Sequence, residues 1–247
     1  MVPEKAAQKI IEWMQEIVAQ AGAKGVVLGI SGGIDSAVAA VLAKRAFPDD
    51  CLGVMMPCGN MQEDEVHSRL LLDKFQIAHT RVDLQDTFRQ MTDRLLPNVE
   101  SGTASETAAR SNIKPRLRMI VLYYLAQARN YLVIGTSNKS ERTVGYFTKH
   151  GDGGADLLPL GDLTKREIYQ LAAYLDIPQE ICRKAPSAGL WEGQTDEAEM
   201  GFTYQQLDAY LEQGTTDAAA LEKIQRMERN SAHKRALPPI AEIDRED

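Results

Sequence analysis

The chain has 247 residues, enough for one sizeable α/β domain that buries its own core. Its formal net charge is -7, with 35 acidic against 28 basic side chains. Proteins that grip a nucleic-acid backbone rely on clustered Lys and Arg, so this balance argues against a nucleic-acid partner.

The sequence also argues against a membrane or secreted protein. No apolar run approaches the length of a membrane-spanning helix, and Glu4, Lys5 and Gln8 occupy positions where a signal peptide is apolar. The three cysteines lack CxxC spacing, so they indicate neither a disulfide framework nor a zinc site. We expect a cytoplasmic protein with reduced, structural thiols.

The first half of the chain alternates helices with apolar strands. Apolar residues at helical spacing predict an amphipathic helix over 3–20. Val66, Leu70 and Leu71 should face inward from a later helix. Strands separated by helices favour a doubly wound parallel sheet whose ligands bind at the carboxyl ends of the strands. The other expected elements here are strands at 26–30, 51–56 and 78–84, and helices at 36–46, 63–75 and 85–96.

The first strand leads into the loop Gly29-Ile30-Ser31-Gly32-Gly33-Ile34-Asp35-Ser36. Its paired glycines allow close backbone approach, and the free amides at the following helix start favour an anion, so the loop is suited to phosphate. Asp35 offers a carboxylate to magnesium. The alternative is a tight turn whose Ser and Asp only cap the helix. Neither Gly-Lys-Ser/Thr nor Gly-x-Gly-x-x-Gly follows this strand, which argues against kinase-like and hydride-transfer chemistry.

In the second half, the polar segment 97–111 contains glycine and is expected to be a loop. The long helix that follows Asn112 has an apolar stripe wider than one contact face needs, which indicates a partner surface. The stretch 137–161 is long, rich in glycine and charged, as active-site lids are. The remaining expected elements are a strand at 131–136 and helices at 164–175, 203–212 and 216–230.

Within the expected lid, one string is specific to a family. Gly145-Tyr146-Phe147-Thr148-Lys149-His150-Gly151-Asp152-Gly153-Gly154-Ala155-Asp156 resembles the Gly-Phe-Phe-Thr-Lys-Tyr-Gly-Asp-Gly-Gly-Ala-Asp loop of ammonia-dependent NAD synthetases. The Ser-Gly-Gly-x-Asp-Ser string is similar to the pyrophosphate loop of the wider adenine-nucleotide alpha hydrolases, which cut ATP between the α and β phosphates. Similarity continues at 112–116, 201–204 and 233–235, and so covers nearly the whole chain.

The resemblance implies a fold and an assembly. The fold would be α/β, with a Rossmann-like doubly wound parallel sheet flanked by helices and a helical C-terminal part. Residues 1–247 would form a single NAD synthetase domain, without a glutamine amidase domain, because only one helix precedes the first strand and the resemblance runs on to His233. Family members are homodimers, which agrees with the wide apolar stripe after Asn112.

It also implies a reaction, the amidation of deamido-NAD. The nicotinate carboxylate would attack the α phosphorus of ATP, releasing pyrophosphate and forming an acyl adenylate, and ammonia would then displace AMP to give NAD. Magnesium, the loop amides and Lys165 would stabilise the charge that develops on the phosphates. A tRNA thiouridylase or a GMP synthetase-like enzyme shares the loop, and a non-catalytic ATP-binding sensor is the alternative from another class.

Position by position, the resemblance implies three sets of ligands. ATP would be held by Gly29, Ile30, Ser31, Gly32, Gly33, Ile34, Asp35, Ser36, Thr136, Lys165 and Ser187. Magnesium would be held by Asp35 and Glu141, and deamido-NAD by Arg116, Lys149, Asp156, His233 and Lys234. Asp35 and Lys165 would be catalytic, with Asp152 or Asp156 attracting ammonium and taking its proton. The sequence departs from the family where 137–141 replaces Asp-His-Ala-Ala-Glu and where Ser187 replaces Thr.

Overall fold

The computed structural model describes residues 1–247 except 60–61, 101, 188, 190, 192 and 244–247. Its strands form one parallel sheet in the order β3-β2-β1-β4. The order changes direction between β1 and β4, so the loop after β1 lies at the switch point where open α/β sheets bind ligands. This confirms the doubly wound parallel sheet. The strands are β1 (Gly25–Gly29), β2 (Cys51–Met55), β3 (His79–Arg81) and β4 (Tyr131–Ile134).

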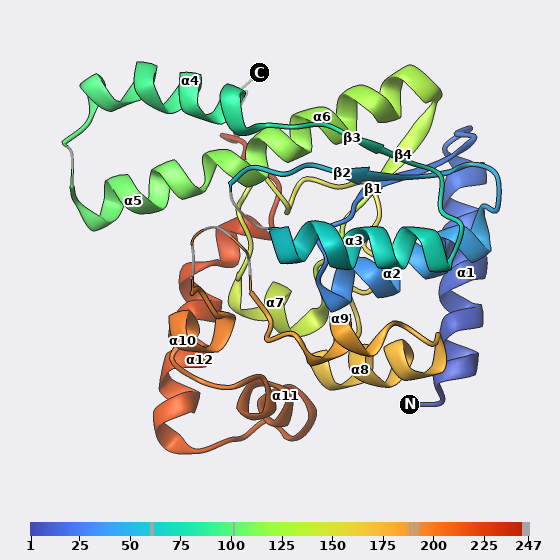
Figure 1. Ribbon diagram of the computed structural model, residues 1–247. Coiled ribbons are helices and arrows are strands. Elements are labelled where there is room, and N and C mark those ends of the chain that lie inside the picture. Colours follow the sequence, from blue (N-terminus) through green and yellow to red (C-terminus); the bar gives the residue numbers. More distant parts are fainter. Residues whose placement is uncertain (60–61, 101, 188, 190, 192, 244–247) are drawn as a thin grey trace, which may run out of the picture.

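Helices cover both faces of the sheet (Figure 1). One layer holds α1 (Pro3–Gln20), α2 (Ile34–Ala46), α3 (Gln62–Lys74), α8 (Lys165–Tyr174) and α9 (Gln179–Arg183). On the opposite face, α6 (Ile113–Arg129) packs against β1 and β4. The helices α4 (Gln85–Leu95) and α5 (Ala104–Ser111), with the short 3-10 helix η1 (Leu96–Asn98) after α4, adjoin α6 and project past the edge of the sheet (Figure 1). A separate group of helices lies beside the sheet: α7 (Lys139–Val144), α10 (Asp196–Met200), α11 (Tyr204–Gln213), α12 (Ala218–Asn230) and η2 (Ala232–Lys234).

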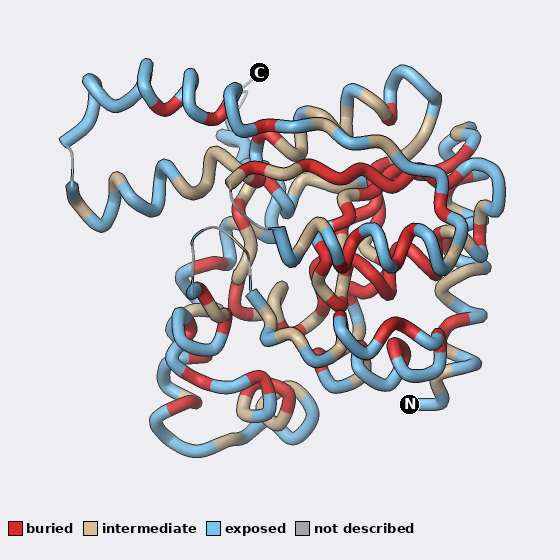
Figure 2. The backbone as a smooth tube through the Cα atoms, in the orientation of Figure 1, coloured by how far each residue is buried: buried red, intermediate tan, exposed pale blue. Residues whose placement is uncertain are grey.

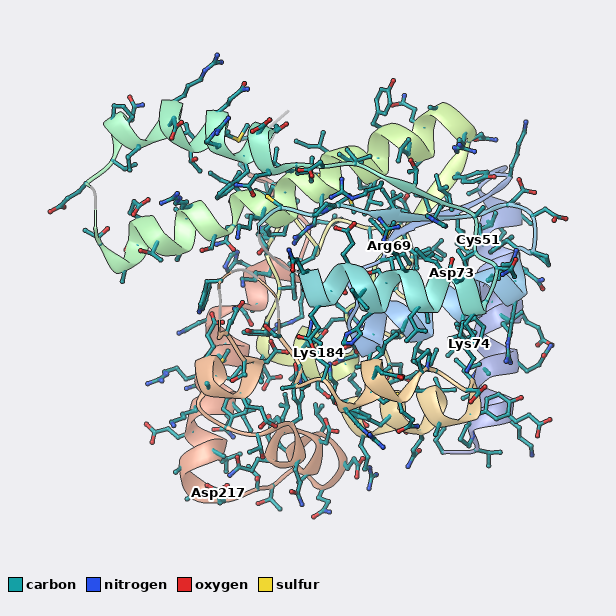
Figure 3. All side chains as sticks on the ribbon, in the orientation of Figure 1. Cys51, Arg69, Asp73, Lys74, Lys184 and Asp217 are labelled. Atoms are coloured by element: carbon teal, nitrogen blue, oxygen red, sulfur yellow. The ribbon has the colours of Figure 1, made fainter. Side chains whose placement is uncertain are left out.

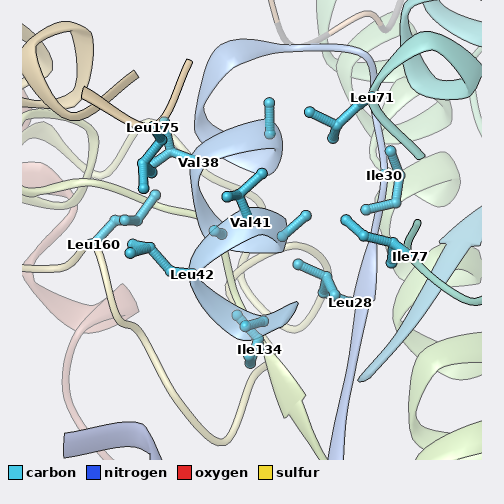
Figure 4. Packing of buried hydrophobic residues seen from close by; sticks show 14 of the residues in the cluster. Leu28, Ile30, Val38, Val41, Leu42, Leu71, Ile77, Ile134, Leu160 and Leu175 are labelled. Atoms are coloured by element: carbon cyan, nitrogen blue, oxygen red, sulfur yellow. The ribbon is translucent and has the colours of Figure 1, made fainter. Parts of the chain in front are cut away.

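The core is centred on α2, which is buried along most of its length (Figure 2). Val38, Val41 and Leu42 pack there among side chains from the sheet and from α3 and α8 (Figure 4). Val26 and Leu28 of β1 join this cluster, whereas Val27 points to the other face and packs with residues of α6. Burial on both faces explains why β1 reads as a continuous apolar run. The loop at its end is therefore held by a rigid scaffold.

Two sequence predictions about α3 and the segment before α6 are wrong. Val66 and Leu70 are 62% and 38% exposed, and only Leu71 of the predicted trio is buried. The inward face of α3 also carries Ser68, whose hydroxyl donates to the Ile30 carbonyl at 3.3 Å. The buried face of the helix therefore differs from the face that the apolar pattern predicted. Residues 97–111 contain η1 and α5 instead of a loop.

The expected glycine-rich lid is shorter than predicted, because its first part folds as α7. A turn-rich segment follows α7 and returns to the edge of β4, where Ile134 and Leu157 form a parallel bridge. Within the described residues, no helix is long and apolar enough to cross a bilayer. The cysteines are free, as predicted, with Cys51 and Cys58 buried.

Candidate active site

The loop between β1 and α2 is held by its own serines. The backbone N–H and the hydroxyl of Ser31 both donate to Ser36 Oγ, at 3.2 and 2.9 Å, and Ser36 Oγ donates to the Gly33 carbonyl at 2.9 Å. Gly33 caps α2 with no side-chain hydrogen bond, which leaves the helix start open to an anion. Gly32 has φ of 78° and lies against the backbone of Asp64, leaving no space for a side chain.

Beside the loop, two carboxylates share one buried ammonium group. Lys165 is 2% exposed, and its Nζ lies 2.5 Å from Asp35 Oδ2 and 3.2 Å from Glu141 Oε1. Burial opposes the charge on Lys165, but Asp35 and Glu141 outweigh it and raise the pKa of the lysine above its ordinary value. The three charges come from α2, α7 and α8, so the fold brings together residues that are far apart in the sequence.

Capping interactions fix the carboxylates in place. The side chain of Asn138 donates to Asp35 Oδ1 at 2.8 Å and accepts from the Glu141 N–H at 3.0 Å, starting α7 with a capping box. Glu141 Oε2 in turn accepts from the Asn138 N–H at 3.2 Å, which leaves Oε1 to face Lys165. Burial and then the Asp35 carboxylate raise the pKa of Glu141, against the pull of Lys165.

A second layer of polar groups lies behind this centre. The Tyr204 hydroxyl donates to Asp196 Oδ2 at 2.8 Å and lies 3.4 Å from Glu141 Oε1. The Tyr204 ring faces Lys165, with Nζ 4.8 Å from the ring centroid. Sequence reasoning missed Asn138, Tyr204 and Asp196 as site residues. The Asn-x-x-Glu capping pattern at 138–141 was a usable signal for the first.

The donor set suits magnesium. In the described part of the chain, no cluster of three or more His, Cys, Asp or Glu side chains is arranged to hold a metal alone. Asp35 and Glu141 nevertheless each present one oxygen atom toward the same ammonium group, that of Lys165, beside the start of α2. Magnesium is commonly held by one or two carboxylates together with substrate phosphates, so this pair fits that ion.

Of the other predicted ATP contacts, Thr136 lies two residues after the end of β4, at the carboxyl edge of the sheet beside β1. Ser187 is exposed, and its hydroxyl accepts from the Gly189 N–H at 3.1 Å.

Three of the residues predicted to bind deamido-NAD lie together at the surface. Arg116 Nη2 donates to the Lys149 carbonyl at 3.4 Å, and Lys149 Nζ donates to the His233 carbonyl at 2.9 Å. Lys234 is engaged differently: its Nζ donates to the carbonyls of Gly145 and Phe147, at 2.8 Å each. Lys234 therefore holds the chain that follows α7, whereas Arg116, Lys149 and His233 contact one another at the surface.

The two aspartates considered as ammonium-binding groups hold backbone in place. Asp152 Oδ1 accepts from the Thr148 N–H at 2.9 Å, within the turn. Asp156 Oδ2 accepts from the Val133 N–H at 2.8 Å, and its Oδ1 accepts from the Tyr123 hydroxyl at 3.0 Å. The Asp156 side chain thus contacts β4 and α6, and the described hydrogen bonds do not join it to the Arg116–Lys149–His233 patch.

The chain matches the family model described as NAD synthase over residues 6–238. It is 49% identical over 243 residues to the NH(3)-dependent NAD(+) synthetase of Syntrophomonas wolfei, covering 98% of both chains. Among solved structures, NMN synthetase from Francisella tularensis superposes with a TM-score of 0.93 at 39% identity, covering 98% of this chain and 100% of that one. The NH3-dependent NAD synthetase of Campylobacter jejuni gives a TM-score of 0.80 at 30% identity, with the same coverage.

Proposed function

This chain belongs to the NAD synthase family, and we propose that Asp35, Glu141 and Lys165 form the centre that handles its ATP. The protein is a ligase, and its reaction is the ammonia-dependent synthesis of NAD. One observation carries the residue assignment: two carboxylates and one buried ammonium converge at the open start of α2. A structural salt bridge alone would not need a glycine loop and a helix start without a side-chain cap beside it.

The residues divide the work by their chemistry. The backbone around Gly32 and the start of α2 would bind the phosphates. Lys165 would place positive charge where charge develops as pyrophosphate leaves, and Asn138 would hold Asp35 in position. Asp35 and Glu141 would hold magnesium, which supplies further charge stabilisation to the phosphates when bound. The acyl adenylate needs protection from water, and the turns at 149–156 would cover it.

The acceptor would extend toward the Arg116–Lys149–His233 patch, whose cationic groups suit the phosphates of deamido-NAD. Exposed apolar side chains on α6, Ile120 at 56% and Tyr124 at 73%, favour a homodimer that packs through this helix.

The similarity to an NMN synthetase at a TM-score of 0.93 supports a second candidate acceptor, the acid form of NMN. The two acceptors differ by an adenylate group, so kcat/KM measured with each separates them. A preference for the dinucleotide of at least about tenfold, or 1.4 kcal/mol, is the result that favours deamido-NAD.

The decisive experiment follows pyrophosphate release from ATP and deamido-NAD with ammonium present. We expect Asp35→Asn to remove most activity and to keep the fold, because the amide preserves size and loses the charge. Pyrophosphate release close to the wild-type rate by the folded variant would contradict the assignment. Wild-type protein that releases pyrophosphate from ATP alone would contradict the role of the acceptor.

A further inference from the structure

Helix α3 is tied at both ends to the segment that follows α8. At its C-terminal end, Lys74 Nζ donates to Asp176 Oδ2 at 2.7 Å and to the Asp176 carbonyl. At its N-terminal end, Asp64 forms an ion pair with Lys184, directly after α9. Figure 3 shows Lys184 below the start of α3 and Lys74 near its other end.

The two ion pairs differ in burial and in what they touch. The Asp64 and Lys184 side chains are 19% and 20% exposed, whereas Asp176 in the other pair is 87% exposed. The backbone of Asp64 also lies against Gly32, so closely that a side chain at Gly32 would meet the Asp64 carbonyl oxygen at 2.5 Å. The inner pair therefore joins the segment after α9 to the phosphate-binding loop itself.

That segment is fixed at a second point. The Pro186 carbonyl accepts from the Asp196 N–H at 3.1 Å, and Asp196 accepts from the Tyr204 hydroxyl beside Glu141. Residues 184–187 thus span from Asp64 at the loop to Asp196 at the carboxylate centre. Ser187, the predicted ATP contact, lies within this span.

We propose that the Asp64–Lys184 ion pair is a positioning latch, which holds the segment carrying Ser187 over the phosphate-binding loop and so sets the affinity for ATP. The inference rests on the proposed function, because it takes Ser187 and the loop as ATP contacts. Neither Asp64 nor Lys184 needs to touch ATP: the pair aligns two segments that do. Alignment before binding lowers the ordering cost of the complex.

The test compares Asp64→Asn, Lys184→Met and the double variant in steady-state kinetics. Each single variant should raise KM for ATP about tenfold, with kcat and KM for deamido-NAD nearly unchanged. The double variant should raise KM for ATP no more than either single variant, because both substitutions remove the same interaction. Lys184→Arg keeps the charge and should recover most of the affinity.

Lys74→Met is the matched control, since it breaks the outer pair of the same helix and leaves the loop alone. A rise in KM for ATP in this control as large as in Asp64→Asn would overturn the latch, because general loosening of α3 would then explain both. Folded Asp64→Asn protein with unchanged KM for ATP would overturn it as well. If the wild type releases no pyrophosphate with deamido-NAD, the proposed function fails. Calorimetric measurement of ATP binding then tests the latch separately, and an unchanged Kd for ATP in Asp64→Asn would overturn it.

Discussion

Replacing Lys165 by Met removes the ammonium group between two half-buried carboxylates and keeps most of the length of the side chain. With Nζ 2.5 Å from Asp35 and 3.2 Å from Glu141, the gross attractions are about 7 and about 5 kcal/mol at an effective dielectric constant of 20. Desolvation of the ions offsets most of this, and removing one partner of a buried pair typically costs about 3–5 kcal/mol. Because Glu141 can take up a proton once Lys165 is gone, we expect the low end, about 3 kcal/mol of unfolding free energy.

The pH dependence of the variant follows from that proton. Burial and Asp35 already raise the pKa of Glu141, and loss of Lys165 removes the group that opposes them. A carboxyl whose pKa is higher in the folded than in the unfolded state binds more protons when folded, so stability falls as pH rises between the two pKa values. With Lys165 present, the folded pKa of Glu141 is raised to about 8, so wild type and variant lose this stability alike up to that pH. The stability deficit of Lys165→Met should therefore grow above it and be larger at pH 9 than at pH 7.

Urea unfolding at both pH values measures the stability, and NAD formation measures the chemistry, where we expect kcat to fall at least about 100-fold. Lys139→Met is the matched control: Lys139 is 41% exposed in its pair with Asp162, so its loss should cost less than about 1 kcal/mol. If Lys165→Met lost no more stability than this control, the buried charge centre would not exist as described. Retention of kcat within a few fold would remove Lys165 from the chemistry.

Three further outcomes are expected. At fixed total ammonium the rate of NAD formation should climb with pH through the neutral range, because the nucleophile is NH3 with a free lone pair. Glutamine should not replace ammonia, and equal turnover with ammonia-free glutamine would refute this prediction. Lys149→Ala should raise KM for deamido-NAD more than KM for ATP. Equal changes in the two KM values would indicate that Lys149 only supports the structure through its contact with His233. Tyr124→Glu places a charge on the exposed apolar stripe of α6 and should therefore shift a dimer toward monomer. Sedimentation at micromolar concentration measures this shift. A wild type that is monomeric and fully active would exclude the shared interface.

The sequence predicted best where one physical signal dominated. The helix at 3–20 and the parallel strands follow from apolar periodicity, and the loop after β1 follows from its glycines and the helix start. The prediction for α3 was wrong at Val66 and Leu70, because periodicity treats the apolar stripe as the buried face. In the fold, the face of α3 toward the loop is partly polar, and Ser68 satisfies the Ile30 carbonyl there.

Short elements were missed for a related reason. Helices α5 and α7 are too short for a clear apolar period, and each begins with a cap followed by glutamate at the third helical position. At α5, Thr103 accepts from the Glu106 N–H at 3.1 Å, a local signal that glycine-based loop assignment overrode. The meeting of Asp35, Glu141 and Lys165 could be expected only through resemblance, since no local pattern joins residues 130 positions apart.

The charges of the centre explain why its parts belong together. With both carboxylates ionised, Asp35, Glu141 and Lys165 together carry one net negative charge, which by itself repels a triphosphate at the start of α2. A divalent cation on the two carboxylates would turn that balance to one net positive charge, and Lys165 could then direct its ammonium to phosphate oxygens. In this structure Lys165 is the counter-ion of both carboxylates, and its positive charge offsets the repulsion between them. The ammonium that pairs with both carboxylates in this structure would thus be the group available to the phosphates once a cation bound with ATP.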